Sequence, residues 1–262
     1  NGNGDGNGDG DGDAERPIMT HPNARRVSLD GKVAIITGAS RGIGRAIAER
    51  LASEGAKLEL VARDRARLDA LVRELPDAVA HVADVASEDD VERVVRDVLE
   101  RRGRVDVLIN NAGIGVFGPI EKTSWDDFVK VLHVNAGGTF LLSRAVVDPM
   151  RRQGAGDILN IASVVGSKGY REQAVYGASK HAVIGLTKAL AVELHGTGVR
   201  VRAISPGGVA TDLIRDARPD LSLDGLIRPE DIADIVAFLL TAPATAVIDN
   251  VNVRRAGNDP WF

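Results

Sequence analysis

Tyr176 and Lys180 stand four residues apart at the start of an apolar stretch. Residues at this spacing share one face of a helix, so the phenol and the ammonium group can point into the same space. A free phenol has a pKa of about 10, and a nearby positive charge stabilises the phenolate and lowers that pKa. The pair therefore predicts a proton donor and acceptor that works near neutral pH. A solvated helix face that carries an unrelated Tyr and Lys has the same spacing.

The rest of the chain must supply the elements that position this pair. From Leu29 onward, apolar runs that are typical of buried strands alternate with stretches of helical periodicity. The predicted strands are 32–37, 58–62, 79–82, 105–109, 157–162, 200–204 and 250–254. The predicted helices are 43–54, 65–75, 88–100, 125–150, 175–195 and 229–240. This alternation predicts one α/β domain, Rossmann-like and doubly wound, with a parallel sheet of about seven strands.

A glycine-rich turn lies between the first predicted strand and the first predicted helix. It contains Gly38, Gly42 and Gly44. In that context glycines permit a tight turn, and the free N–H groups of the helix N-terminus face a pyrophosphate. We therefore expect residues 29–262 to form a dinucleotide-binding and catalytic domain. A plain glycine loop is the alternative, and the spacing differs from the usual G-x-G-x-x-G.

The first residues have a different composition. Residues 1–13 alternate Gly with Asn or Asp, and the tail 1–28 is predicted to be disordered because it has little apolar surface to bury. A calcium loop is the alternative interpretation. Counted from Asp5, however, it would need Glu at its twelfth position, where Arg16 stands.

Composition excludes several classes of protein. The 262 residues are 44% hydrophobic, carry a net charge of −4 and include no cysteine. The interspersed charges give no basis for binding nucleic acid or a membrane surface. No apolar run approaches the roughly 20 residues that cross a bilayer. The histidines are scattered, so we expect no metal site, and we expect a cytoplasmic enzyme.

Several short motifs follow one another in an order that is typical of one family. They are Thr-Gly-x-x-x-Gly-x-Gly at 37–44, Asp84-Val85, Asn-Asn-Ala-Gly at 110–113, Asn135, Ser163 thirteen residues before Tyr176, and Pro206-Gly207. With these motifs the chain resembles the short-chain dehydrogenases/reductases from Leu29 to near its C-terminus. The resemblance implies a nicotinamide-dependent oxidoreductase that acts on a ketone or a secondary alcohol.

The resemblance also implies which residues act. Tyr176 would exchange a proton with the substrate oxygen, and Lys180 would lower the Tyr176 pKa and bind the nicotinamide ribose. Ser163 would hold the substrate oxygen, and Asn135 would belong to a water-linked proton relay to Lys180. A turn cap at Ser163 and a satisfied core amide at Asn135 are the alternatives. The implied cofactor-binding residues are Gly38, Ser40, Arg41, Gly42, Ile43, Gly44, Arg63, Asp84, Val85, Asn111, Ala112, Gly113, Tyr176, Lys180, Pro206, Gly207, Val209 and Thr211.

The end of the second predicted strand indicates a preference for NADP(H) over NAD(H). In NAD-preferring dinucleotide folds, an acidic side chain at this place binds the ribose 2′-hydroxyl. Here Ala62 occupies that place and Arg63 follows, while Arg41 lies in the glycine turn. Guanidinium groups suit a 2′-phosphate because their donors form a planar fork. Asp64 adds an opposing charge, and two solvated surface arginines are the alternative.

Some functional questions stay open at this level. A nucleotide-binding regulatory or scaffold protein on the same fold is the second hypothesis, because fold does not determine function. Among enzymes, a 3-oxoacyl thioester reductase and a sugar or polyol dehydrogenase remain alternatives.

Two regions bear on subunit assembly. Residues 251–257 replace the D-G-G-like turn with which many family members end their last strand. The helices 125–150 and 175–195 carry more apolar surface than one sheet face needs, and together with the resemblance they predict a homotetramer.

Overall fold

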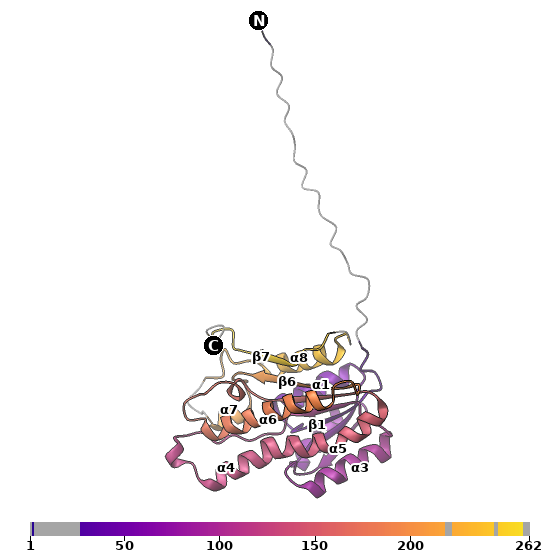
Figure 1. Ribbon diagram of the computed structural model, residues 1–262, viewed down its shortest axis with the longest axis horizontal. Helices are drawn as coiled ribbons and strands as arrows, with labels where there is room; N and C mark the ends of the chain where they lie inside the picture. The colour runs from indigo at the N-terminus through magenta and orange to yellow at the C-terminus, as the bar shows by residue number, and fades with distance from the viewer. Residues whose placement is uncertain (1, 3–26, 218–221, 244–245, 259–262) are drawn as a thin grey trace.

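The computed structural model of the chain describes residues 2, 27–217, 222–243 and 246–258. It contains one seven-stranded, all-parallel sheet with the strand order β3-β2-β1-β4-β5-β6-β7. Helices cover both faces of this sheet (Figure 1). The predicted doubly wound α/β fold is therefore confirmed. Most of the tail 1–28, with its predicted disorder and the alternative calcium loop, lies outside the described residues.

The elements follow the predicted alternation to within a few residues. The strands are β1 Val33–Thr37, β2 Lys57–Ala62, β3 Ala78–Val82, β4 Val107–Asn110, β5 Gly156–Ile161, β6 Val199–Pro206 and β7 Asn250–Val253. The α-helices are α1 Gly42–Ser53, α2 Arg65–Glu74, α3 Glu88–Arg102, α4 Trp125–Leu132, α5 Gly138–Gln153, α6 Ala174–Glu193, α7 Asp212–Ala217 and α8 Pro229–Thr241. Short 3-10 turns occupy η1 Ile120–Lys122 and η3 Val164–Gly166, and η2 His133–Gly137 is a π-helix.

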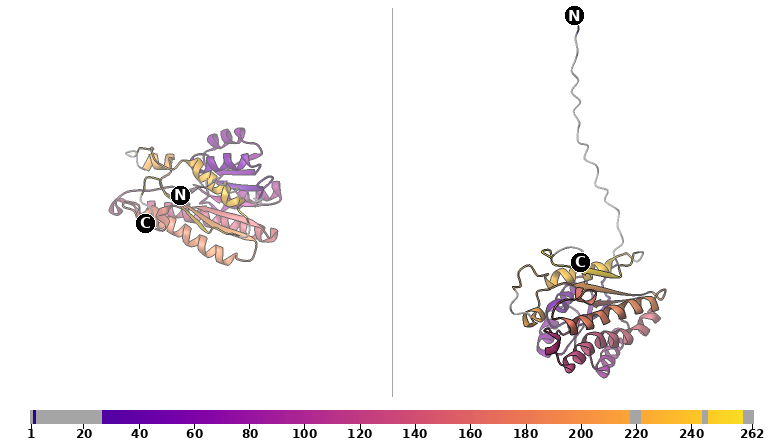
Figure 2. Two further views of the ribbon diagram at one scale, coloured as in Figure 1. Left: turned by 90° about the horizontal axis from the view of Figure 1, so that it is seen from above. Right: turned by 60° about the vertical axis from the view of Figure 1, so that its left-hand side comes forward.

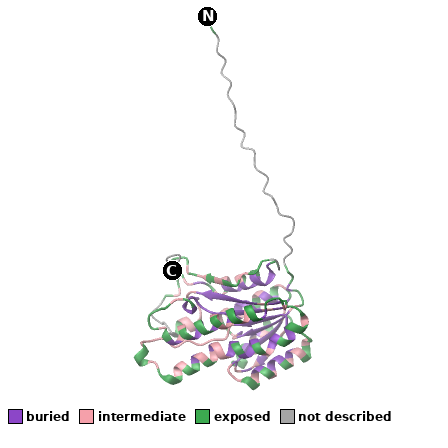
Figure 3. Cartoon of the chain, in the orientation of Figure 1, coloured by how far each residue is buried: buried purple, intermediate pink, exposed green. Residues whose placement is uncertain are grey.

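The central strands are apolar along their whole length because both of their faces are covered. In β1, Ala34 and Ile36 belong to the core on one face, with side chains of α1, α2 and α8. Val33 and Ile35 belong to the core on the other face, with side chains of α3 and α5. Figure 2 shows yellow α8 and orange α6 on opposite sides of the sheet. In Figure 3 buried residues follow the central strands, and exposed residues lie on the outer faces of the helices.

The strand order reverses between β1 and β4, and this reversal decides where a ligand can bind. From β1 the chain proceeds outward to β2 and β3, then returns to place β4 on the other side of β1. The loops that follow β1 and β4 therefore diverge and leave a crevice at the carboxyl ends of the strands. The predicted glycine turn and the Asn-Asn-Ala-Gly motif both lie at this edge.

Two local predictions differ from the structure. The single helix predicted over 125–150 is divided into α4, the π-helix η2 and α5. The short helix α7 was not predicted, because six residues are too few to establish a helical period.

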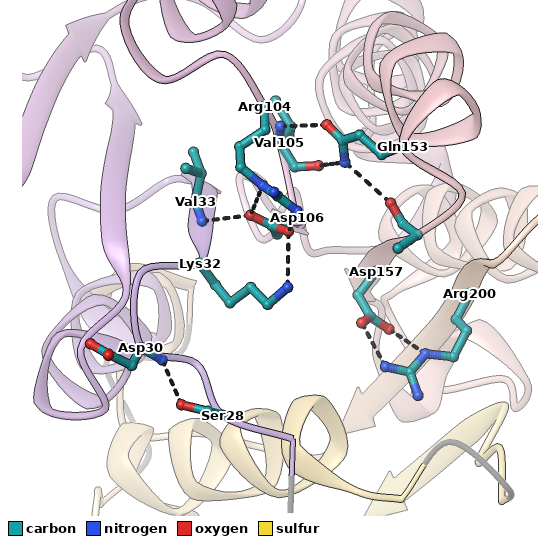
Figure 4. Close-up of polar contacts among 11 residues, drawn as sticks. Ser28, Asp30, Lys32, Val33, Arg104, Val105, Asp106, Gln153, Asp157 and Arg200 are labelled. Atoms are coloured by element: carbon teal, nitrogen blue, oxygen red, sulfur yellow. Dashed lines mark hydrogen bonds and ion pairs between the residues drawn. The ribbon is translucent and has the colours of Figure 1, made fainter.

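Charged side chains stabilise the opposite, amino-terminal edge of the sheet, which Figure 4 draws. Asp106 precedes β4 and accepts hydrogen bonds from the Val33 amide at 3.0 Å, Arg104 Nη2 at 2.6 Å and Lys32 Nζ at 3.2 Å. Burial alone would raise the pKa of this carboxyl. The bonds from Arg104, Val33 and Lys32 outweigh burial and hold the pKa below its ordinary value. Nearby, Asp157 accepts two hydrogen bonds from Arg200.

We expect Asp106→Asn to lower the free energy of unfolding at pH 7 by about 1.5–3 kcal/mol, the usual contribution of a hydrogen bond to a charged group. A carboxyl with a depressed folded pKa stabilises the fold above its unfolded pKa, and this stabilisation is lost as the pH falls through the folded value. Urea unfolding should therefore show a gap between wild type and variant at pH 7 that narrows below about pH 4. A gap that is independent of pH, or one equally large for the exposed control Glu121→Gln, would contradict this role.

Candidate active site

A cleft of about 710 Å³ opens at the carboxyl ends of the strands, beside the crevice between β1 and β4. Most residues predicted from the sequence line it. They are Gly38, Ser40, Arg41, Gly42, Ile43, Arg63, Asp84, Val85, Asn111, Ala112, Gly113, Ser163, Tyr176, Lys180, Pro206, Gly207, Val209 and Thr211. Gly44 and Asn135 are not among the lining residues, and their contacts place them just behind the wall. The fold thus brings motifs that follow six different strands, β1 to β6, together in one cleft.

The glycine turn has a shape that side chains would obstruct. Gly38 and Gly42 have φ angles of +62° and +56°, which favour glycine. A Cβ atom at Gly38 would lie 2.9 Å from the Cα of Ala112. A Cβ atom at Gly44 would lie 2.2 Å from the carbonyl oxygen of Gly38, so this glycine allows α1 to start against the turn. The turn and the first helical N–H groups form a cradle that fits a pyrophosphate.

Thr37 and Asn111 fasten this cradle to β4. The Thr37 hydroxyl accepts hydrogen bonds from the backbone N–H groups of Asn111 at 2.9 Å and Ala112 at 3.0 Å. The Asn111 amide donates to the carbonyls of Thr37 and Gly38 at 2.9 and 3.2 Å. Its neighbour Asn110 belongs to the same motif but has a different role. It is buried, donates to Ser143 and Asn160 at 3.2 and 2.9 Å, and does not line the cleft.

Tyr176, Ser163 and Lys180 meet at one end of the cleft. Tyr176 and Lys180 lie on α6, and Ser163 follows β5. The Ser163 side chain hydrogen-bonds the Tyr176 hydroxyl and also donates to the Pro206 carbonyl at 3.2 Å. The Lys180 ammonium lies 5.8 Å from the centre of the Tyr176 ring. The two α6 side chains thus share one face of the helix, as their spacing predicts.

The direction of the Tyr176 pKa differs from the expectation. Burial raises the pKa of Tyr176 to about 12, and the hydrogen bond from Ser163 lowers it only in part. Among the described residues, the Lys180 ammonium donates a hydrogen bond to the Ile161 carbonyl at 2.9 Å and none to the phenol oxygen. Burial also lowers the pKa of Lys180 to about 8, because the charged ammonium is removed from water. The influence that opposes burial at the Tyr176 phenol is thus the Ser163 hydrogen bond rather than the charge of Lys180.

Asn135 is held behind this group by the π-helix η2. Its side-chain oxygen accepts from the Ile114 N–H at 2.8 Å, and its amide donates to the Ile114 carbonyl and the Ser179 hydroxyl, both at 2.9 Å. A Cβ atom at Gly113 would lie 3.2 Å from the Asn135 oxygen and 3.7 Å from the Lys180 nitrogen, so both polar groups face the same glycine. Sequence reasoning missed Ser179 as the partner. A buried amide in an apolar stretch signals that such a partner exists but not which residue it is.

The opposite end of the cleft carries a group of arginines around the end of β2. Ala62 is buried there, and Arg63 is exposed. Arg41 pairs with the Asp212 carboxylate at 3.1 Å, and Arg67, which sequence reasoning missed, approaches the same carboxylate at 3.5 Å. Within the described part of the chain, the Arg63 side chain has no hydrogen bond or ion pair.

Asp64, whose negative charge opposes phosphate binding at this corner, stabilises the start of α2. It is the N-cap of α2 and accepts a hydrogen bond from the Arg67 N–H at 3.0 Å. The corner therefore combines two carboxylates, Asp64 and Asp212, with three cationic side chains.

The wall beyond Tyr176 is largely apolar. Phe117 packs on the Tyr176 ring with the two ring centres 5.3 Å apart. Val165, Ile214 and Leu226 add aliphatic surface. The segment after β7 closes this end with Arg254, Arg255 and Asn258.

Two further observations limit what the described residues can do. No helix among them is both long enough and apolar enough to cross a bilayer. Nor do the described residues place three or more potential ligands among His, Cys, Asp and Glu side chains where they could hold a metal ion.

Comparison with known proteins gives consistent matches. Residues 32–222 match the family model described as short chain dehydrogenase. A 3-oxoacyl-[acyl-carrier-protein] reductase of Synechocystis is 41% identical over 245 residues, covering 90% of this chain and 99% of that protein. Levodione reductase of Leifsonia aquatica is 38% identical over 252 residues, covering 87% and 94%.

Solved structures of similar reductases have the same fold as this chain. The 3-ketoacyl-(acyl-carrier-protein) reductase from Brucella melitensis, complexed with NADH, superimposes with a TM-score of 0.81. It is 35% identical and covers 87% of this chain and 99% of that one. The crystal structure of levodione reductase gives a TM-score of 0.80 at 37% identity, covering 86% and 96%.

The burial of Lys180 makes a prediction about stability. Below pH 8 the folded protein bears the full cost of enclosing the charged ammonium. Between about 8 and 10.5 the folded state has lost a proton that the unfolded state keeps, so stability rises with pH. Relative to Lys180→Met, wild type should therefore gain up to about 3 kcal/mol from pH 7 to pH 10, at roughly 1.4 kcal/mol per pKa unit.

Urea unfolding at both pH values measures this gain. The exposed lysine of the same helix provides the control Lys188→Met, for which the gap to wild type should not change with pH. The difference in free energy of unfolding between wild type and Lys180→Met should therefore change in favour of wild type as the pH rises. A constant difference, or a change in favour of the variant, would contradict the burial of a charged amine.

Proposed function

Because this chain belongs to the short-chain dehydrogenase family of oxidoreductases, we propose that it transfers a hydride between NADP(H) and a ketone or secondary alcohol, with Tyr176 as general acid and base. The observation that carries this proposal is the meeting of Tyr176, Ser163 and Lys180 in one cleft with the glycine cradle. The cradle supports a dinucleotide because Gly38 and Gly44, where a Cβ atom would collide with neighbouring backbone or with Asn111, let the turn, the start of α1 and the loop after β4 pack closely around the free N–H groups of the helix. When bound, the nicotinamide supplies or accepts the hydride.

The residues of the cleft can perform the proton chemistry. A phenol with a pKa of about 12 remains protonated at neutral pH and is a hydrogen-bond donor to a carbonyl oxygen. The Ser163 hydroxyl lies beside Tyr176 and donates its single proton to the Pro206 carbonyl; by turning that proton to the substrate oxygen it can stabilise charge that develops there. Lys180 keeps a positive charge close to the phenol while the proton leaves.

Asn135 supports this group from behind the wall. Its amide is anchored to Ile114 and Ser179, and its oxygen and the Lys180 nitrogen both lie within 4 Å of the Cβ position at Gly113. This position suits the expected water-linked relay between Asn135 and Lys180. A regulatory or scaffold role receives less support, because a protein that only binds nucleotide does not need these four side chains together.

The arginines at the end of β2 support NADP(H) as the preferred cofactor. Ala62 offers no carboxylate to the ribose, and Arg63 is unpaired within the described residues. Arg41 is already neutralised in part by Asp212 at 3.1 Å. We therefore infer that Arg63 makes the larger contribution to binding a 2′-phosphate and Arg41 the smaller one. The Brucella relative was crystallised with NADH, so the preference of this chain for NADPH over NADH needs a direct measurement.

Exposed apolar side chains on the outer helices support a homotetramer. Val129 of α4 and Phe140 of α5 are 43% and 46% exposed, more than large apolar side chains usually are. Leu141 and Val183, two apolar residues within the helices predicted to form this surface, are instead buried in the chain's own fold at 9% and 1% exposure. The proposed interface therefore rests on fewer residues than the sequence suggested.

We expect Tyr176→Phe to lower kcat at least about 100-fold, because positioned general acids contribute that much or more. Binding of NADPH should change little, since the ring still packs on Phe117. The control is Tyr170→Phe, the other tyrosine of the chain, which also lines the cleft. Steady-state reduction of a panel of ketones measures both. Retention of more than a few per cent of activity by Tyr176→Phe would remove it as the proton donor.

We expect wild type to prefer NADPH, and Arg63→Ala to lower kcat/KM for NADPH by roughly 10- to 100-fold while sparing NADH. This range corresponds to about 1.5–3 kcal/mol for a charge-assisted hydrogen bond. Arg41→Ala should show the same selectivity with a smaller loss. Arg65→Ala, an exposed arginine outside the cleft, is the control. Equal use of both cofactors by wild type, or proportional losses in the variants, would contradict the preference.

We expect light scattering at micromolar concentration to give about four times the chain mass of 27.7 kDa. Phe140→Asp should reduce that mass, because a charge would be buried in the interface. The control Glu121→Gln changes an exposed residue outside these helices and should leave the tetramer intact. A wild-type protein with the mass of a single chain is the outcome that would refute assembly.

A further inference from the structure

Five arginines line the cleft, and they differ in what their side chains bind. Arg41 and Arg67 pair with Asp212, and Arg254 donates to three backbone carbonyls of the C-terminal segment at 2.6–3.2 Å. Within the described residues, the side chains of Arg63 and Arg255 alone among the five have neither a hydrogen bond nor an ion pair. Arg63 stands at the cofactor corner, so Arg255 is the one whose ligand is unassigned.

Arg255 lies at the end of the cleft where Ser163 and Tyr176 meet. Ser163 donates to the carbonyl of Pro206, and the next residue, Gly207, donates to the Val253 carbonyl at 2.7 Å. A Cβ atom at Gly208 would lie 3.8 Å from the Arg255 side chain. Gly208, which lies beside Arg255, is therefore only two residues along the backbone from Pro206, the partner of Ser163. The Cα atoms of Gly208 and Pro206 are at most about 7.6 Å apart.

The surroundings of Arg255 explain why an unpaired cation there points to a ligand. It is only partly exposed, and the aliphatic Leu226 lies near it, because a Cβ atom at Gly208 would meet both side chains within 4 Å. A guanidinium group beside apolar walls lacks part of its hydration and binds anions more strongly than one in open solvent.

We propose that Arg255 binds an anionic group of the substrate, so that this chain prefers carbonyl compounds with an apolar body and a carboxylate or phosphate beyond it. The proposal rests on the proposed function, since it places the substrate carbonyl at Tyr176 and Ser163. Arg254 positions the segment by bonding its carbonyls, and Arg255 remains available to bind the ligand as a planar fork. Arg255 is thus a determinant of specificity and takes no part in proton transfer.

Paired substrates test the proposal and identify the anion. We would measure kcat/KM for 5-oxohexanoate against its methyl ester, and for acetoacetyl-coenzyme A against the phosphate-free acetoacetyl-N-acetylcysteamine. We expect wild type to favour the charged member of at least one pair, and that pair identifies a carboxylate or a carrier phosphate as the ligand. Arg255→Ala should lose roughly 10- to 100-fold on that charged member and little on its neutral partner. Arg255→Lys should recover part of the loss.

Arg152→Ala is the matched control, because it removes an equal charge from an exposed residue outside the cleft. It should leave both ratios unchanged. Equal losses on charged and neutral substrates in Arg255→Ala, or a wild type that favours the neutral member of both pairs, would overturn the proposal.

Direct binding separates this proposal from the proposed function. Calorimetric titration with octanoate and with the neutral octanamide, in the presence of NADP⁺, requires no turnover. We expect wild type to bind octanoate at least 10-fold more tightly than octanamide and Arg255→Ala to bind the two alike. A protein that reduces no carbonyl but keeps this contrast would refute the proposed function alone. Turnover without any contrast in either experiment would refute the role of Arg255 alone.

Discussion

The enclosed ammonium of Lys180 sets the main constraint on this structure. A charged amine loses hydration when it is buried, and here the pKa of Lys180 falls to about 8 as a result. The carbonyl of Ile161, at the end of β5, compensates in part by accepting a hydrogen bond at 2.9 Å. This bond ties α6 to the sheet at the place where Tyr176 meets Ser163. A site that requires such a group costs stability, which the surrounding fold must supply.

Stabilising contacts and the candidate site lie at opposite edges of the parallel sheet. At the amino-terminal edge, Asp106 and Asp157 are saturated with arginine, lysine and backbone donors. At the carboxyl edge, polar groups are fixed by neighbours but leave space between them. Asn111 links the glycine turn to β4, and Asn135 faces Lys180 from the π-helix. One edge is therefore closed by ion pairs, and the other remains open for a ligand.

Patterns that are local in the chain could be predicted, whereas long-range contacts could not. The strand Val33–Thr37 and the helix Gly42–Ser53 are evident from apolar runs and helical spacing. The π-helix at Asn135 leaves no periodic signal, because it changes the helix for only five residues.

The chemistry of the site depends even more on such contacts. The raised pKa of Tyr176 comes from burial by several elements, and the partner of Arg41 is Asp212, 171 residues away. The motifs thus predicted which residues would meet, but not their protonation or pairing.

The central claim, hydride transfer in this cleft, is tested most directly with NADPH deuterated at C4 and a ketone panel, followed by mass spectrometry of the alcohol. The account predicts one deuterium at the carbinol carbon with wild type, for one of the two C4 epimers, and almost none with Tyr176→Phe. Binding of NADPH without transfer to any ketone would contradict it and favour a regulatory nucleotide-binding role.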